Sequence, residues 1–426
     1  MKKARKTVCV AMSGGVDSSV TAALLKKQGY VVFGVHIRCF NVDGCAERDA
    51  NDARRVAEQL NIPFYTFDLE KEYKERVVEY MVKGYTQGIT PNPDVMCNKE
   101  IKFGLFLKRA LELGAGSIAT GHYVRIRVAD AIPSTRSGFS SRNLRWSSRR
   151  AGFDVAPLQA YQNHRAALPQ SFGNGITTPH FSLLIAKDKN KDQSYFLWTL
   201  TQKQLQHCLF PLGEYTKPAV RALAKKYNLP TAEKKDSQGI CFLGQVSLAN
   251  FLKSYIPARR GAVLTTTGKT IGEHRGAPLY TIGQRHGFTI KIQDSLPRQN
   301  CGGQARFKIQ EKKRDALPHY VIEKNITANT LTVAEGNANP ALYKKEIMLN
   351  DIHFINPLYP KPPSLNPLPL LARVRYRAPL APATLAQLST NNYKLIFKYP
   401  QRCIAPGQSA VFYNSKKEML GGGIIA

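Results

Sequence analysis

The sequence predicts an amino-terminal α/β domain with a parallel sheet, followed by a carboxyl-terminal β-barrel or sandwich. Over the first 125 residues, strand-like apolar runs alternate with helical patterns, as in a parallel sheet that is covered on both faces. From about Tyr280 onward, short strand patterns lie between turns, which is typical of barrels and sandwiches. At 426 residues, the chain is long enough for two or three domains.

The amino-terminal elements follow one another in a regular order. The predicted strands are "KTVCVAM", "VVFGVHI", "PFYTFDL" and "SIATGHYVRI". The predicted helices are "SSVTAALLKKQGY", which ends at Gly29, "ERDANDARRVAEQLNI", a long helix from Lys71 to about Lys83, and "KEIKFGLFLKRALELG". Ligands of parallel sheets bind at the carboxyl ends of the strands, so the loops that follow the strands are the candidate site.

Residues from about 129 to 180 interrupt this order. They are rich in Ser, Arg, Asn, Gly and Pro and have no sustained period, as in "STRSGFSSRNLRWSSRR". We predict a disordered or loosely packed insertion that adds positive charge. Ordered patterns resume with "FSLLIAKDKNKDQSYFLWTL" and the helix "TKPAVRALAKKYNL", and the later strands are "HYVIEKN", "TLTVAEG", "LLARVRYRA", "YKLIFKY" and "QSAVFYN".

The charge balance indicates the kind of partner. There are 61 Lys and Arg against 30 Asp and Glu, which gives a formal net charge of +31. Basic residues run through the whole chain, which favours a broad contact surface over a basic targeting arm. RNA, DNA or another polyanion is therefore the expected partner.

The cysteines and the apolar runs indicate the compartment. Eight cysteines are scattered along the chain, and the start "MKKARKTVCVAMSGG" has only a short apolar run after its basic residues, unlike a secretory signal. No run approaches the roughly eighteen apolar residues that span a bilayer. We expect a cytoplasmic protein with reduced thiols, no membrane partner and no protein-built metal site, since no Cys-x-x-Cys pair accompanies Cys97 or Cys241.

A glycine pair lies between the first predicted strand and the first predicted helix, in "VCVAMSGGVDSSVTAALL". Without side chains, Gly14 and Gly15 let backbone N–H groups approach phosphate oxygens, and the helix that follows adds its positive end. The hydroxyls of Ser13, Ser18 and Ser19 can donate further bonds. Asp17 can hold Mg²⁺ or cap the helix. The turn is thus a phosphate-binding candidate, and the alternative is an ordinary tight turn.

Cys97 lies in "TPNPDVMCNKEIKF", at the edge of a predicted helix. The helix dipole and Lys99 favour the thiolate there, and Asp94 is near enough to accept or donate a proton. Cys241 lies in the loop "EKKDSQGICFLG", where no helix constrains it. A reactive thiol beside a phosphate-binding turn suggests nucleophilic or sulfur chemistry. The alternative is that both cysteines are packing residues.

Seven segments, in order along the chain, carry a family resemblance: "AMSGGVDSSV", "DARRVAEQL", "TPNPDVMCNKEIKF", "ATGHYVRI", "KDQSYFL", "DSQGICFLG" and "RCIAPGQSAVFY". They resemble the bacterial tRNA-specific 2-thiouridylases of the PP-loop ATP pyrophosphatase superfamily. The resemblance covers nearly the whole chain apart from the insertion. It implies a Rossmann-like PP-loop domain, similar to the adenine nucleotide alpha hydrolases, over residues 1–213. It also implies a small central α+β domain over 214–283 and a tRNA-binding β-barrel over 284–426.

The resemblance implies a reaction and its partners. ATP and Mg²⁺ would activate the 2-oxygen of the wobble uridine in tRNAs for lysine, glutamate and glutamine, and sulfur would replace that oxygen. A cysteine desulfurase or a sulfur-relay protein would supply the sulfur. Cys241 would carry it as a persulfide and Cys97 would be the partner nucleophile. Free hydrosulfide or the persulfide itself can attack the base, and both routes leave a Cys97–Cys241 disulfide.

The resemblance also assigns individual residues. Expected ATP contacts are Ala11, Met12, Ser13, Gly14, Gly15, Val16, Asp17, Ser18, Ile37 and Gly121. Expected contacts to the target base are Asn92, Pro93 and Asp94, the last also as general acid or base. Expected tRNA contacts are His122, Lys191, Asp192, Gln193, Arg375, Tyr376 and Gln408.

Two other functions are compatible with parts of this pattern. Another PP-loop ligase, such as an amidotransferase or a lysidine synthetase, would share the glycine turn but would need no cysteine pair. A non-catalytic RNA-binding protein would share the basic charge but would have no use for the intact "SGGVDSS".

The basic insertion is interpreted as passive. We therefore expect deletion of Ala131 to Gly175 to leave thiolation largely intact, measured by mass spectrometry of tRNA nucleosides against the full-length chain. Loss of most tRNA affinity in the shortened chain would contradict this interpretation.

Overall fold

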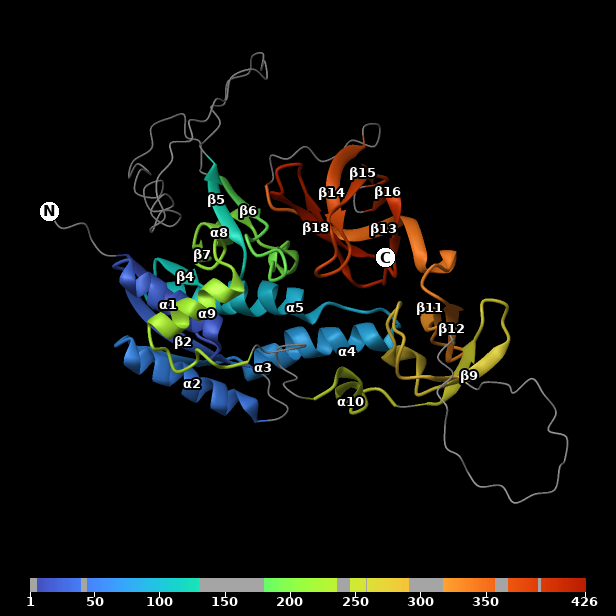
Figure 1. Cartoon of the computed structure of the whole chain (residues 1–426), viewed down its shortest axis with the longest axis horizontal. Coiled ribbons are helices and arrows are strands. Elements are labelled where there is room, and N and C mark those ends of the chain that lie inside the picture. Colours follow the sequence, from blue (N-terminus) through green and yellow to red (C-terminus); the bar gives the residue numbers. More distant parts are fainter. Residues whose placement is uncertain are drawn as a thin grey trace, which may run out of the picture.

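The structure is a computed structural model of the chain (Figure 1). It describes residues 6–39, 44–129, 180–235, 246–257, 259–290, 317–356, 367–389 and 392–426. The predictions for Cys241 and for the insertion between residues 129 and 180 lie outside the described residues. Within those residues, no helix is long and apolar enough to cross a membrane.

The amino-terminal domain contains the predicted parallel sheet. Its strand order is β3-β2-β1-β4-β7, and every neighbouring pair is parallel. The strands are β1 Thr7–Ala11, β2 Val31–Arg38, β3 Phe64–Asp68, β4 Ser117–Ala119 and β7 Cys208–Leu209. The helices α1 Val16–Lys27 and α2 Cys45–Gln59 pack against these strands, and α9 Lys217–Lys226 packs against α1. The domain also contains the short helix α8 Gln202–Leu205. The predicted α/β class is thereby confirmed.

The predicted strand "SIATGHYVRI" is two strands in the structure. After β4 the chain leaves the sheet, and β5 Arg125–Ala129 pairs with β6 His180–Leu184 in a separate antiparallel ribbon. The break occurs around Gly121, which packs directly on the start of α1. A Cβ on Gly121 would lie 3.0 Å from the backbone carbon of Asp17. Close packing on the glycine turn thus replaces strand pairing here.

Two long helical segments lie on the side of the sheet toward the other domains (Figure 1). The first is α3 Glu70–Tyr73, the π-helical η1 Lys74–Val78 and α4 Glu79–Thr86. The second is α5 Pro93–Met96, the π-helical η2 Cys97–Phe106 and α6 Leu107–Glu112. The second segment begins six residues before the predicted "KEIKF" start, because Asn92 caps it and Pro93 is its first residue.

The central domain is a sheet with the order β10-β9-β8-β12-β11. Its elements are α10 Leu248–Leu252, β8 Gly261–Leu264, β9 Thr270–His274, η4 Ala277–Leu279, β10 Thr289–Ile290, β11 His319–Asn325 and β12 Thr330–Glu335. The sequence analysis assigned β11 and β12 to the carboxyl-terminal domain. In the structure β12 instead pairs with β8, and the fully buried Leu331 and Val263 lie side by side in this domain's core.

The carboxyl-terminal domain is a closed barrel with the order β13-β16-β15-β14-β17-β18, which confirms the predicted barrel. Its elements are η5 Pro340–Leu342, β13 Tyr343–Phe354, β14 Leu368–Arg373, β15 Ala381–Gln387, β16 Tyr393–Arg402, β17 Ser409–Tyr413 and β18 Met419–Ile425. Alternating side chains such as Leu349, Leu395 and Phe412 fill its interior.

A buried polar contact joins the barrel to the amino-terminal domain. Asp192 and Arg373 form an ion pair at 3.0 Å, and their side chains are only 2% and 7% exposed, respectively. Beside it, Ser194 of η3 Ser194–Phe196 and Tyr413 of β17 share a hydrogen bond of 2.9 Å. The guanidinium of Arg373 also lies over the Tyr413 ring, 5.0 Å from its centroid. These contacts fix the orientation of the barrel.

Breaking this ion pair should destabilise the protein strongly. We expect Arg373→Met to lower the free energy of unfolding by about 3–5 kcal/mol, because a buried carboxylate is left without its partner. Urea unfolding followed by fluorescence measures this. The exposed pair of Lys71 and Glu75 is the control, and Lys71→Met should cost less than about 1 kcal/mol. Equal effects of the two substitutions would contradict the assignment.

Candidate active site

The glycine turn joins the carboxyl end of β1 to the start of α1. Gly14 has φ +74°, and a Cβ there would lie 2.2 Å from the carbonyl oxygen of Asp49 in α2, so only glycine fits. Ser18 Oγ accepts from the Ser13 amide at 3.2 Å and donates to the Gly15 carbonyl at 3.0 Å. The turn is thus held by its own hydroxyls, and the first amides of α1 have no partner within the helix. This is the geometry of an anion-binding turn.

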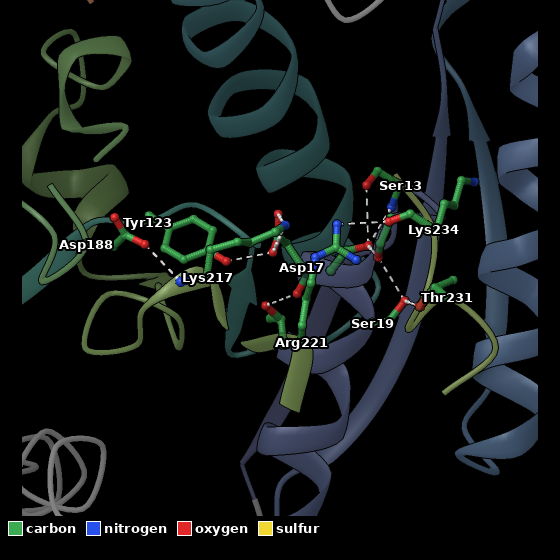
Figure 2. Close-up of polar contacts among 12 residues, drawn as sticks. Ser13, Asp17, Ser19, Tyr123, Asp188, Lys217, Arg221, Thr231 and Lys234 are labelled. Atoms are coloured by element: carbon green, nitrogen blue, oxygen red, sulfur yellow. Dashed lines mark hydrogen bonds and ion pairs between the residues drawn. The ribbon is translucent and has the colours of Figure 1, made fainter. Parts of the chain in front are cut away.

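Asp17 connects three segments rather than capping α1 (Figure 2). Its carboxylate accepts from both Tyr123 Oη at 2.8 Å and Lys217 Nζ, which reaches its two oxygens at 2.8 and 2.9 Å. Gly121 lies against the same turn. Asp17 is therefore at the meeting point of α1, the chain after β4 and the start of α9.

The neighbouring strand completes this edge of the sheet. Met12 follows β1 directly, and its carbonyl lies 3.1 Å from His36 Nδ1. Burial lowers the pKa of His36, so the neutral ring donates from Nδ1 to this carbonyl. Ile37 is the next residue of β2 and packs against the core. The residues predicted to contact ATP thus lie at adjoining strand ends, and the contact itself stays a prediction.

The chain just before the Cys241 segment lies against the glycine turn (Figure 2). Thr231 donates to Ser19 Oγ at 2.9 Å, and Lys234 pairs with Asp49 at 2.7 Å. Arg221 of α9 donates to the carbonyls of Ala232 at 3.0 Å and Lys234 at 3.1 Å. These contacts hold residues 231–235 against the glycine turn and the neighbouring helices α2 and α9.

Sequence reasoning did not find Tyr123, Lys217, Arg221, Thr231 or Lys234. Tyr123, Lys217 and Thr231 bond to Asp17 or Ser19, from which they are separated by 106 to 212 residues along the chain. The stretch "TKPAVRALAKK" has the pattern of an ordinary surface helix. The one usable signal was a lysine directly before a proline at a helix start, a pattern that is common without function.

Cys97 lies deeper in its helix than the sequence suggested. The helix begins at Pro93, and Asn92 Oδ1 caps it by accepting from the Val95 amide at 3.3 Å. Because the dipole effect fades beyond the first turn, it gives the Cys97 thiol little of the stabilisation expected from a helix start. Lys99 lies 3.7 Å from Glu100, which offsets its charge. The expectation of a helix-activated thiolate is therefore weakened by the geometry.

The surroundings of Cys97 are apolar. Its side chain is buried with Tyr73, Ile101 and Leu252, the last from α10 of the central domain. Val246, the first described residue after the Cys241 segment, packs against the same cluster. The helix is π-helical from Cys97 onward, a conformation that often marks functional sites.

Asp94 lies three residues before Cys97, on the same face of the helix. Burial raises the pKa of the Asp94 carboxyl above its ordinary value, and the charge of Lys102 acts in the opposite direction. A raised pKa keeps a proton available on the carboxyl, as a general acid requires.

The barrel fastens the loop that precedes this helix. Gln408 Nε2 donates to the carbonyls of Thr90 at 2.9 Å and Pro91 at 3.3 Å, and the Thr90 amide donates to Pro406 at 2.8 Å. Tyr195 Oη donates to the carbonyl of Ser409, the residue after Gln408, at 2.9 Å. Gln408 thus holds the loop in place through hydrogen bonds, and its contact with tRNA stays a prediction.

The other predicted tRNA contacts divide into exposed and enclosed side chains. Arg375 is exposed, and Tyr376 stacks on Phe196 with centroids 4.6 Å apart. Asp192 is enclosed by its ion pair, and Gln193 Oε1 accepts from the Tyr123 amide at 3.0 Å. Lys191 is partly exposed beside them. Contact of these residues with tRNA stays a prediction.

His122 is also enclosed. Its ring lies between Phe103 and Phe210, and Nδ1 is 2.8 Å from Thr120 Oγ1. Burial lowers the pKa of His122 well below its ordinary value, so the ring is neutral. A neutral, 8% exposed histidine offers little to a phosphate.

Comparison with known proteins defines the class. The model of the tRNA methyl transferase HUP domain matches residues 6–142 and 164–245. The tRNA methyl transferase PRC-barrel domain matches 249–335, and the aminomethyltransferase beta-barrel domain matches 344–425. The molecule is thus a HUP-domain protein of the nucleotide-binding PP-loop type with two appended β domains.

Full-length relatives define the family. The tRNA-specific 2-thiouridylase MnmA of Pseudomonas putida (strain W619) is 38% identical over 99% of this chain and 95% of its own length. Its namesake in Streptococcus mutans serotype c is 40% identical over 98% of this chain and 94% of its own. This chain belongs to the tRNA-specific 2-thiouridylase family, which confirms the resemblance. A solved NMN synthetase from Francisella tularensis covers 57% of the chain at 18% identity with a TM-score of 0.29, on which nothing rests.

The raised pKa of Asp94 makes a prediction for stability. The folded protein keeps this proton at pH values where the unfolded chain has lost it, so the contribution of Asp94 to stability falls as pH rises above the ordinary value of 3.8. Asp94→Asn should remove this dependence, so the stability of the variant relative to the parent should increase as the pH rises above 3.8. Urea unfolding midpoints measure it. Glu79→Gln removes an exposed carboxylate as control, and the same pH dependence in parent and Asp94→Asn would refute the assignment.

Proposed function

We propose that this chain converts the wobble uridine of tRNA into 2-thiouridine, with AMP and pyrophosphate as the other products. The observation that carries this proposal is the combination of two elements. One is the glycine turn, which has the geometry of a phosphate-binding turn, and the other is the loop before Asp94 and Cys97, which a hydrogen bond from the barrel holds in place. Family membership supplies the chemistry that this junction serves.

The first step activates the base. The uridine 2-oxygen attacks the α-phosphorus of ATP, the bond to the bridging oxygen breaks, and pyrophosphate leaves with the electron pair. The 2-oxygen, a poor leaving group, then leaves as part of AMP. The amides at the start of α1 and the hydroxyl of Ser13 would stabilise the phosphate charge, while Ser18 Oγ donates to the Gly15 carbonyl and holds the turn.

Mg²⁺ would accompany ATP in this step. Asp17 is the carboxylate in the turn, although Lys217 and Tyr123 engage it. Within the described residues, no group of three or more His, Cys, Asp or Glu side chains is arranged to hold a metal ion. The phosphates would therefore supply most of the ligands, and the ion would neutralise their charge.

The second step replaces oxygen by sulfur. Cys97 attacks the Cys241 sulfur of the persulfide and releases hydrosulfide, or the terminal persulfide sulfur attacks C2 of the base first and Cys97 resolves afterwards. Either way a Cys97–Cys241 disulfide forms, and an external thiol must reduce it. Support comes from the flanks of the Cys241 segment: residues 231–235 contact the glycine turn and Val246 packs in the cluster of Cys97.

The number of residues between Val246 and Cys241 limits how far apart the two can lie. Five residue steps separate Val246 from Cys241. An extended chain covers at most about 3.3–3.6 Å per residue, or roughly 17 Å in all. Asp94, whose pKa is raised by burial, is the proposed acid or base beside the reacting oxygen.

The partners follow from the charge and from the family. A net charge of +31 suits tRNA, and Arg375 and Lys191 are the proposed phosphate contacts near the loop. We propose the lysine, glutamate and glutamine isoacceptors as substrates and a cysteine desulfurase or a relay protein as sulfur donor. The proposed location is the cytoplasm, where thiols stay reduced.

Separate loss of the two steps tests the proposal. Cys97→Ser and Cys241→Ser should each lower thiolation by at least about a hundredfold, because no other group replaces the nucleophile, while tRNA-dependent pyrophosphate release continues. Nucleoside mass spectrometry and a pyrophosphate assay measure the two steps. The control is Cys208→Ala, a buried cysteine in β7. Full thiolation by either serine variant would exclude the proposed route through both cysteines, and no pyrophosphate release by the parent would exclude the adenylation step.

A further inference from the structure

Lys217 is a buried cation at the phosphate turn that none of the assigned functions uses. Its ammonium bonds both carboxylate oxygens of Asp17, at 2.8 and 2.9 Å, and its side chain is only 10% exposed (Figure 2). The carboxylate of Asp17 belongs to the first turn of α1, directly after Gly15 and Val16. The lysine thus points at the place where phosphate is expected.

The root of this side chain is fixed. Lys217 is the first residue of α9, and its amide donates to Asp188 Oδ2 at 2.9 Å. The helix α9 packs against α1, as Figure 1 also shows. The backbone of Lys217 is thus anchored, and its ammonium lies against Asp17, two residues after Gly15 of the turn.

Stability alone is a weak reason for this pair. A carboxylate in the first turn of a helix is already favoured by the helix dipole, and Tyr123 donates a hydrogen bond to it. Burying an ammonium costs solvation that an ion pair often fails to recover. A turn with positive potential and an additional ammonium group beside it is suited to bind a ligand with several negative charges.

We propose that Lys217 is a further catalytic residue, whose ammonium transfers from Asp17 to the pyrophosphate part of ATP. The inference rests on the proposed adenylation. When the bond between the α-phosphorus and the bridging oxygen breaks, the electron pair stays on pyrophosphate, and the ammonium stabilises that charge. Lys217 gives up no proton and forms no covalent bond. In the absence of nucleotide, Asp17 stores the cation at the site.

Nucleotide binding tests this without turnover. Calorimetry on the full chain should show that Lys217→Met lowers the affinity for ATP and for inorganic pyrophosphate by about tenfold or more. This is the contribution expected of one hydrogen bond to a charged group. Affinity for AMP, which lacks the pyrophosphate, should stay within about twofold. Lys217→Arg should recover part of the loss, and tRNA-dependent pyrophosphate release should fall in parallel with the affinity.

Two further variants guard against a folding defect. Lys217→Gln keeps a donor for Asp17 without the charge and should show the same selective loss. Lys394→Met removes a lysine paired with Glu346 on the barrel and should bind ATP, pyrophosphate and AMP like the parent. Equal weakening of AMP and pyrophosphate, or unchanged pyrophosphate binding, would overturn the inference. A parent that binds pyrophosphate but releases none from ATP would instead refute the proposed function.

Discussion

The buried ion pair between Asp192 and Arg373 is the contact on which the arrangement of the molecule depends. It fixes the barrel against the amino-terminal domain and so brings Gln408 to the loop before Pro93. That loop sets where the helix of Asp94 and Cys97 begins. The position of the Cys97 thiol relative to the glycine turn therefore depends on an ion pair that belongs neither to the Cys97 helix nor to the turn.

Local pattern was enough to predict most of the fold. The alternation of strands and helices and the later short strands depend on periodicities of a few residues, which the sequence displays directly. The pairing of β12 with β8 could not be seen, because a strand of the central sheet and a strand of the barrel have the same alternation. The helix start at Pro93 was missed because a proline pair suggests a turn, although proline is also favoured as a first helical residue.

The site was predictable only where one short segment forms it. The glycine turn needed nothing beyond "SGGVDSS", since its hydroxyls and amides are neighbours in the chain. Lys217 could not be found, because its partner Asp17 is 200 residues away. Asp192 and His122 were predicted to contact tRNA, but both side chains are buried and bond to protein groups. The sequence alone does not show whether a polar side chain faces solvent or bonds to a buried partner.

The hydrogen bonds of Gln408 have a consequence for how such a chain can be recombined. The acceptors are main-chain carbonyls of Thr90 and Pro91, which any sequence would present, but the donor comes from the last part of the barrel. The three parts are therefore not interchangeable modules. A foreign barrel grafted in place of residues 344–425 would leave those carbonyls without this donor, and the segment that leads to Cys97 would lose its hydrogen bonds to the barrel.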